Sequence, residues 1–227
     1  MSPYPNKSLT LLELLIAITL IGVVALGFFS IDLFSRHQVI SSERLIIVQS
    51  DVSYILDHMQ KEISKAVGNE RIDGVDNVID IDDHVGWEMA GIKIYIDANG
   101  NGRRDPLGYD RWINYRFMTN IQQTPPHPDE FVLEYCGWCQ PYQDEECAAC
   151  WLPVGTPYKI SRRILNCTFF KPKMDSGNNN MLTDNYIGVN ITACWDPHNQ
   201  TRYLCGTPDN PAVTMQRRIN MPAVSTN

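Results

Sequence analysis

The chain has 227 residues, a formal net charge of −7 and seven cysteines. This acidic balance argues against a general nucleic-acid-binding protein, because neutralising a phosphate backbone needs a surface rich in Lys and Arg. The length is sufficient for one folded domain with an appendage.

A short polar leader, residues 1–8, precedes an almost wholly apolar run over residues 9–30. The first 21 residues of this run would form a helix about 32 Å long, enough to cross a hydrocarbon core of about 30 Å. We therefore predict a membrane-spanning helix there. Lys7 before the span and Asp32 after it favour a cytoplasmic N-terminus and an exported C-terminal part. The alternative is a secretory signal that is cut after Ala25-Leu26-Gly27.

Glu13 is the only charged residue in the first 21 residues of this run. A carboxylate within a membrane helix is costly, about 2.5–3.5 kcal/mol for Asp at the bilayer centre, so it needs a partner or a shallow position. One interpretation is that Glu13 lies at the headgroup boundary. The other is that it is neutralised by a specific cation.

The residues around Glu13 favour the second interpretation. The stretch from Ser8 to Leu14 reads SLTLLEL and resembles the class III signal of type IV prepilins, with Ser8 in place of the usual Gly and Leu9 in place of the usual Phe. The resemblance implies that prepilin peptidase cuts between Ser8 and Leu9 and methylates the new amine of Leu9. It also implies that Glu13 pairs with the N-terminal amine of a neighbouring subunit and sets the register of a filament, since buried charges are tolerated as a hydrogen-bonded pair.

The next segment, residues 31–68, is predicted to continue the helix with an amphipathic pattern. Its apolar residues recur mainly at steps of three and four: they are Leu45, Val48, Val52, Ile55, Leu56, Met59, Ile63 and Val67. No proline interrupts residues 9–67, so one helix of about 59 residues, ending at a Gly68 cap, is expected. A dimeric coiled coil is the alternative use of this stripe. The stretch from Val48 to Asn69 also resembles the equivalent helix of PilW-type minor pilins.

Residues 69–227 are predicted to form a globular domain. Candidate strands are Gly91–Ile96, Arg111–Met118, Glu130–Tyr135, Tyr186–Thr192 and Ala212–Met221. Clusters of Pro, Asn and Gly separate them. The expected fold class is therefore α+β, with the long helix packed on a mainly antiparallel sheet and with loops stapled by disulfides.

One loop carries oxygen-bearing side chains at positions 1, 3, 5 and 9 of a calcium-type loop, with Gly102 at position 6. These candidate ligands are Asp97, Asn99, Asn101 and Asp105. The bidentate acid expected at position 12 is replaced by Gly108, although Asp110 follows. The missing ligand favours a turn between two strands over a calcium site. PilW-type minor pilins carry a similar run before a strand like Trp112–Arg116.

All seven cysteines follow the two helical segments. The candidates for disulfides are Cys136, Cys139, Cys147, Cys150, Cys194 and Cys205, with Cys167 left over. The first four have the spacing of a zinc knuckle, and their CxxC pairs also suggest redox chemistry. An exported domain oxidises its thiols, so we expect disulfides in preference to zinc. Cys194 and Cys205 are expected to close one loop.

No nucleophile elbow or phosphate loop is present in the sequence, which predicts a structural protein and not an enzyme. The resemblance implies a filament subunit that starts in the inner membrane and ends in a pilus at the cell surface. Its expected partners are other pilin subunits, prepilin peptidase, the inner-membrane assembly platform and, before assembly, the lipid bilayer. A type II secretion pseudopilin in a periplasmic pseudopilus and a membrane-anchored periplasmic binding or redox module are the alternatives.

Overall fold

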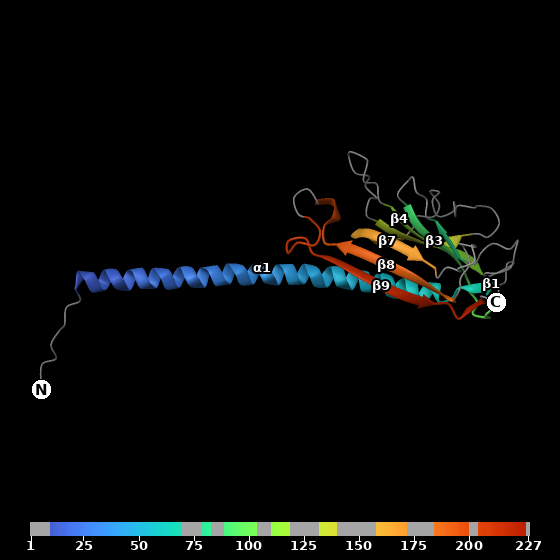
Figure 1. Ribbon diagram of the computed structural model, residues 1–227, viewed down its shortest axis with the longest axis horizontal. Coiled ribbons are helices and arrows are strands. Elements are labelled where there is room, and N and C mark those ends of the chain that lie inside the picture. The colour runs from blue at the N-terminus through green and yellow to red at the C-terminus, as the bar shows by residue number, and fades with distance from the viewer. Residues whose placement is uncertain are drawn as a thin grey trace, which may run out of the picture. The chain divides into compact units, whose positions relative to one another are not determined.

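The chain is a mixed α+β structure, as predicted. The computed structural model shown in Figure 1 describes residues 10–69, 79–82, 89–103, 110–118, 132–139, 158–171, 184–199 and 204–225. Two compact units are distinguished along the chain, Met1–Glu43 and Arg44–Asn227.

A single helix, α1 (Leu11–Ile63), accounts for 53 residues and contains both predicted helical segments. Up to Ile40 its side chains are exposed on every side, so none of the residues that the structure describes covers this apolar run. From Val48 onward one stripe is buried, and its spacing is that of one helix face. The buried residues of the stripe are Val48, Val52, Ile55, Leu56, Met59 and Ile63.

The prediction that α1 ends at a Gly68 cap is wrong. The helix ends at Ile63, and two short-range bonds close its last turn, from Lys65 N to Glu62 O at 3.2 Å and from Ala66 N to Ile63 O at 3.0 Å. Strand pairing begins directly after this turn. Ala66 forms an antiparallel bridge to Ile96, and the next residues form β1 (Val67–Asn69). Gly68 lies within β1 and has a φ of 138°, a backbone conformation that glycine adopts without steric cost.

The larger sheet has five strands in the order β2-β3-β4-β5-β6, and every pairing in it is antiparallel. The strands are β2 (Ile79–Asp82), β3 (Met89–Ile96), β4 (Arg111–Met118), β5 (Val132–Cys139) and β6 (Tyr158–Ser161). The loop of the calcium-type pattern follows β3. It therefore lies between two strands that pair directly with each other, as expected of a turn between strands.

A second antiparallel sheet has the order β7-β8-β9, and its strands are β7 (Ile164–Phe170), β8 (Tyr186–Cys194) and β9 (Ala212–Asn220) (Figure 1). A short helix, η1 (Pro197–Asn199), follows β8. β10 (Ala223–Ser225) pairs in parallel with β1, so the chain end and the residues just after α1 meet in a two-stranded sheet.

The buried stripe of α1 packs in one hydrophobic cluster with residues of both larger sheets. Ile55 and Met59 are fully buried, as are Ile94 on β3 and Val189 on β8. Because the stripe is covered within its own chain, it is not the seam of a dimeric coiled coil. This packing confirms the prediction that the helix lies against antiparallel strands.

Candidate functional site

The first turn of α1 is a capping box. Thr10 precedes the helix, and its side-chain oxygen accepts a bond from the Glu13 backbone N–H at 3.3 Å. The Glu13 Oε2 atom in turn accepts bonds from both the backbone N–H and the Oγ1 hydroxyl of Thr10, each at 3.0 Å. This reciprocal pattern satisfies donors that have no partner within the helix. The sequence Thr-x-x-Glu carries its signature, although the sequence analysis did not identify it.

The capping box fixes where the Glu13 carboxylate lies in the isolated chain. Ser8 and Leu9, the predicted cleavage and methylation positions, lie outside the described residues. Thr10 is therefore the first described residue, and its own N–H points at Glu13. The predicted amine partner of Glu13 belongs to a neighbouring subunit, so that pairing would be additional to this contact within the chain.

The helix beyond the capping box exposes its apolar side chains. The exposed fractions of Leu12, Ile21 and Phe29 are 66%, 68% and 61%. Contiguous apolar surface of this kind marks a site that is covered by lipid or protein. By length and composition, α1 is able to cross a membrane, and the apolar window that qualifies it has no residue buried against the rest of the chain.

The loop after β3 holds its shape through its own side chains. Asp97 Oδ1 accepts the backbone N–H groups of Asn99 and Gly100, and Oδ2 accepts that of Gly102 at 2.6 Å. Asn99 accepts the N–H of Asn101 at 2.9 Å. Desolvation raises the pKa of the Asp97 carboxyl, but the backbone hydrogen bonds outweigh it, so the pKa lies below the usual range.

These bonds are side-chain-to-backbone turns, and the side-chain oxygens of three of the four predicted ligands, Asp97, Asn99 and Asn101, accept them. The fourth, Asp105, lies outside the described residues. No cluster of three or more His, Cys, Asp or Glu side chains suited to a metal is found among the residues that the structure describes.

Cys194 and Cys205 form a disulfide with a Cα–Cα distance of 5.8 Å, as predicted. Cys136 is also disulfide-bonded. The side chain of Cys139, like Cys147 and Cys150, lies outside the described part of the chain. Cys167, the one cysteine for which no disulfide was predicted, is a free thiol, and complete burial raises its pKa.

Arginines bind the second sheet and its loops to α1. Arg163 donates to Asp51 at 2.6 Å, and Arg217 donates to Asp57. The guanidinium of Arg163 also lies 4.5 Å from the ring centroid of Trp195, just after β8. The sequence contains no local signal for these contacts. Their partners are separated from them by more than 100 residues.

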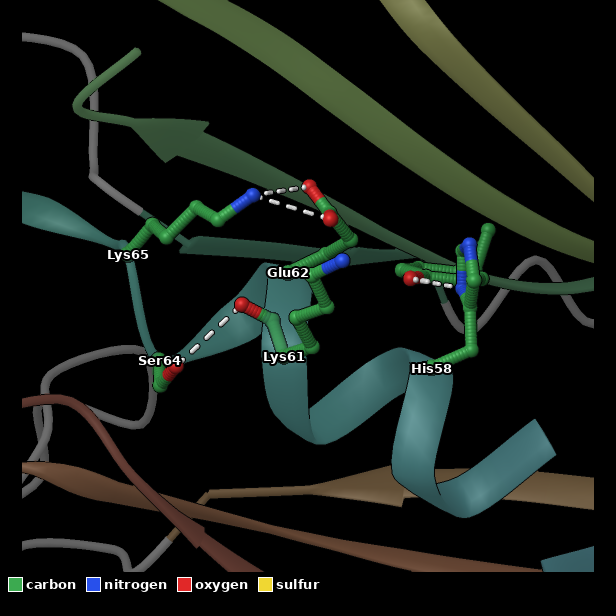
Figure 2. A network of polar contacts seen from close by, with 6 residues as sticks. His58, Lys61, Glu62, Ser64 and Lys65 are labelled. Carbon is green, nitrogen blue, oxygen red and sulfur yellow. Dashed lines mark hydrogen bonds and ion pairs between the residues drawn. The ribbon is translucent and has the colours of Figure 1, made fainter. Parts of the chain in front are cut away.

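A polar cluster lies at the end of α1, as Figure 2 shows for His58 and Glu62 on the helix and Lys65 just after it. His58 Nδ1 is 3.0 Å from the hydroxyl of Tyr115, and its ring meets that of Tyr135 edge-on at 4.8 Å between centroids. Desolvation lowers the pKa of His58, which Glu62 opposes and two nearby lysines reinforce. Burial, with Glu62 nearby, raises the pKa of Tyr135 to about 12. The cluster joins the helix to the first sheet.

A comparison with protein families matches residues 5–29 to the prokaryotic N-terminal methylation motif. The match includes the predicted cleavage position, the Thr10–Glu13 capping box and most of the apolar run. Neither the curated proteins nor the solved structures contain a match to the chain.

Proposed function

We propose that this protein is a structural subunit of a type IV pilus or a related filament, and that it acts as a minor pilin in pilus assembly or at the tip. The observation that carries the proposal is the match of residues 5–29 to the methylation motif, together with the apolar surface of α1 up to Ile40, which no other residue that the structure describes covers. The globular unit supplies a folded head that is distinct from that surface.

In this proposal the leader is removed between Ser8 and Leu9 by prepilin peptidase, and the Leu9 amine is methylated. The chain waits in the inner membrane with its N-terminus in the cytoplasm and its C-terminal unit exported. The assembly platform then moves the apolar helix from lipid into a bundle of helices from other pilin subunits. Either environment covers the exposed Leu, Ile and Phe side chains of α1.

Glu13 changes partner during this transfer. In the isolated chain Thr10 supplies its hydrogen bonds. In the filament the positive amine of an adjoining subunit would give it an ion pair, and a buried carboxylate is stable only when such a partner and hydrogen bonds are both present. The pair therefore specifies how far one subunit is displaced along the next.

Intact-mass analysis of the protein extracted from its native membranes tests the proposal. We expect a mass that begins at Leu9 with one added methyl group. An N-terminus at Met1 would contradict processing. A cut after Gly27 would indicate an ordinary exported protein and would favour the periplasmic binding or redox module.

The periplasmic pseudopilus of a type II secretion system uses the same processing, so mass analysis does not separate it from a pilus. Labelling of intact cells with an antibody against the globular unit does. We expect signal on surface filaments, whereas a pseudopilus subunit would be labelled only after the outer membrane is opened.

A further inference from the structure

The outer face of the second sheet carries a regular array of uncharged polar side chains. Alternation along the strands places Ile187, Val189 and Ile191 of β8 in the core, fully buried, and turns the intervening residues outward. Register aligns the outward residues in three rows across β7, β8 and β9. The rows are Asn166–Thr192–Thr214, Thr168–Asn190–Gln216 and Phe170–Gly188–Arg218.

The side chains of this array are held in place by their neighbours. The hydroxyl oxygens of Thr192 and Thr214 lie 2.9 Å apart across β8 and β9. Phe170 covers Gly188, because a Cβ atom on that glycine would lie 1.9 Å from Cζ of the ring. Phe170 as a whole residue is still 41% exposed. An aromatic side chain laid over a strand glycine orders the ring as well as the strand.

The array also explains two glycosylation-type sequons. Asn166-Cys167-Thr168 and Asn190-Ile191-Thr192 each place Asn and Thr two residues apart on a strand, which directs both to one face. Their central residues, Cys167 and Ile191, are fully buried. The Asn-x-Thr pattern at these two positions therefore arises because the strand alternates. Its outward side chains are amides and hydroxyls, and its inward side chains are apolar.

The charge on this face limits what it can bind. The protein has a net charge of −7, yet the three rows contain no acid and only one cation, Arg218. The guanidinium of Arg218 lies 3.4 Å from the ring centroid of Tyr186, so it is stacked on an aromatic ring. An anionic partner would therefore meet only one countercharge in the three rows, that of Arg218. An apolar partner would meet only one exposed ring, that of Phe170.

We propose that the outer face of β7, β8 and β9 is a docking surface for an extended neutral polysaccharide. Amide and hydroxyl side chains both donate and accept hydrogen bonds, as an uncharged polyhydroxyl chain requires. They repeat about every 4.8 Å across the strands and about every 7 Å along them, so successive sugar units meet similar groups. The exposed Phe170 ring offers an apolar plate to the C–H face of one unit.

The test uses the full chain in detergent on an array of immobilised oligosaccharides. Uncharged chains of glucose, mannose, galactose and N-acetylglucosamine are compared with anionic chains of uronic acids. We expect binding to at least one neutral chain, weakened about three- to tenfold by Phe170→Ala through loss of the ring. Thr168→Ala and Gln216→Ala should each weaken it by a similar factor through a lost hydrogen bond.

Matched controls separate surface chemistry from folding. Gln49→Ala removes an exposed glutamine from α1 and should leave binding unchanged. Gly188→Ala keeps Phe170 but forces its ring off the sheet, so it should reproduce the loss seen with Phe170→Ala. Because the three substituted side chains on the array are exposed, unfolding temperatures should stay close to that of the unsubstituted chain.

Three results would overturn the proposal: no binding to any neutral chain, binding to anionic chains alone, or neutral binding that the array variants leave intact. Sedimentation velocity tests for a fourth. A self-association that Gln216→Ala abolishes and Gln49→Ala preserves would assign the face to a second copy of the chain. None of these outcomes depends on processing at Leu9, so the filament proposal is tested separately.

Discussion

Replacing Glu13 with glutamine separates the capping role of this side chain, seen in its bonds with Thr10, from its proposed ion-pairing role. Glutamine also serves in a capping box, so Glu13→Gln keeps an acceptor for the Thr10 hydroxyl and backbone N–H while it removes the negative charge. Thr10→Ala does the reverse, because it removes the side-chain half of the box and leaves the carboxylate. The two variants therefore form a matched pair.

The expected magnitudes differ. Losing the Thr10 cap costs about 0.5–2 kcal/mol of helix stability. Removing one partner of a buried ion pair costs about 3–5 kcal/mol, since the other charge is left uncompensated. The second cost corresponds to a loss of incorporation of roughly 100- to 4000-fold. Glu13→Gln should also insert into lipid at least as easily as the parent chain, because no charge remains to be buried.

The assay measures incorporation against a fixed membrane pool. Both variants are expressed beside the tagged parent chain, and the amounts in sheared filaments and in membranes are quantified by immunoblot. We expect Glu13→Gln to accumulate in membranes and to be nearly absent from filaments, with Thr10→Ala intermediate. Equal incorporation of Glu13→Gln and the parent chain would refute the ion-pair argument. Loss of Glu13→Gln from membranes as well would locate its effect before assembly.

Three further predictions concern the globular unit. Cys205→Ala opens a loop with a sequence separation of 11 and should lower the free energy of unfolding by roughly 3 kcal/mol, which thermal or denaturant unfolding measures; a change below about 1 kcal/mol would contradict it. The pKa of His58 is lowered, so the unfolded chain binds the proton more tightly, and the His58 contribution to stability is present above about pH 6.5 and is lost as the pH falls through the folded pKa; an imidazole NMR titration midpoint above 6.5 would contradict this. The side-chain oxygens around Asp97 already hold its loop, so calcium titrated into the chain should release no binding heat, whereas saturable heat that Asp97→Ala abolishes would establish a calcium site.

The local parts of the fold could be predicted from the sequence. β4 has the predicted bounds, and β3, β8 and β9 lie within a few residues of theirs, because alternating apolar residues bounded by turns form a local signal. The stripe on α1 was likewise predicted residue by residue from Val48 to Ile63, whereas Leu45, also predicted, is only half-buried. Apolar spacing determines these elements without reference to the rest of the chain.

The remaining elements depend on contacts between distant parts of the chain. β1 and β10 have three residues each, too few for an alternating pattern, and they pair with each other across about 150 residues. β6 has four residues, and β7 contains Asn166 and Thr168 on its outer face. The end of α1 was misplaced for the same reason, since pairing of Ala66 with Ile96 ends the helix before Gly68.

The candidate site also divides into features with a local sequence signal and features that depend on distant contacts. Thr10 and Glu13 are three residues apart, so their capping box could have been predicted from the motif alone. The contact of Arg163 with Asp51 and Trp195 depends on the packing of a sheet against a helix. The residues next to Arg163 include the basic Arg162 and no acid, so the local sequence carries no sign of this contact.

The physical distinction between membrane and filament depends on the few polar atoms of the apolar helix. Lipid tails cover Leu12, Ile21 and Phe29 as well as neighbouring helices do, so the hydrophobic effect contributes little to helix association within a membrane. The long apolar surface of α1 therefore requires a cover but does not by itself favour one cover over the other. The Glu13 carboxylate does favour the filament, because an adjoining subunit can supply a cation to pair with it and lipid tails cannot. If Thr10 alone fully satisfied Glu13 in both environments, nothing at this end of the helix would favour the filament, and the charge would be dispensable there.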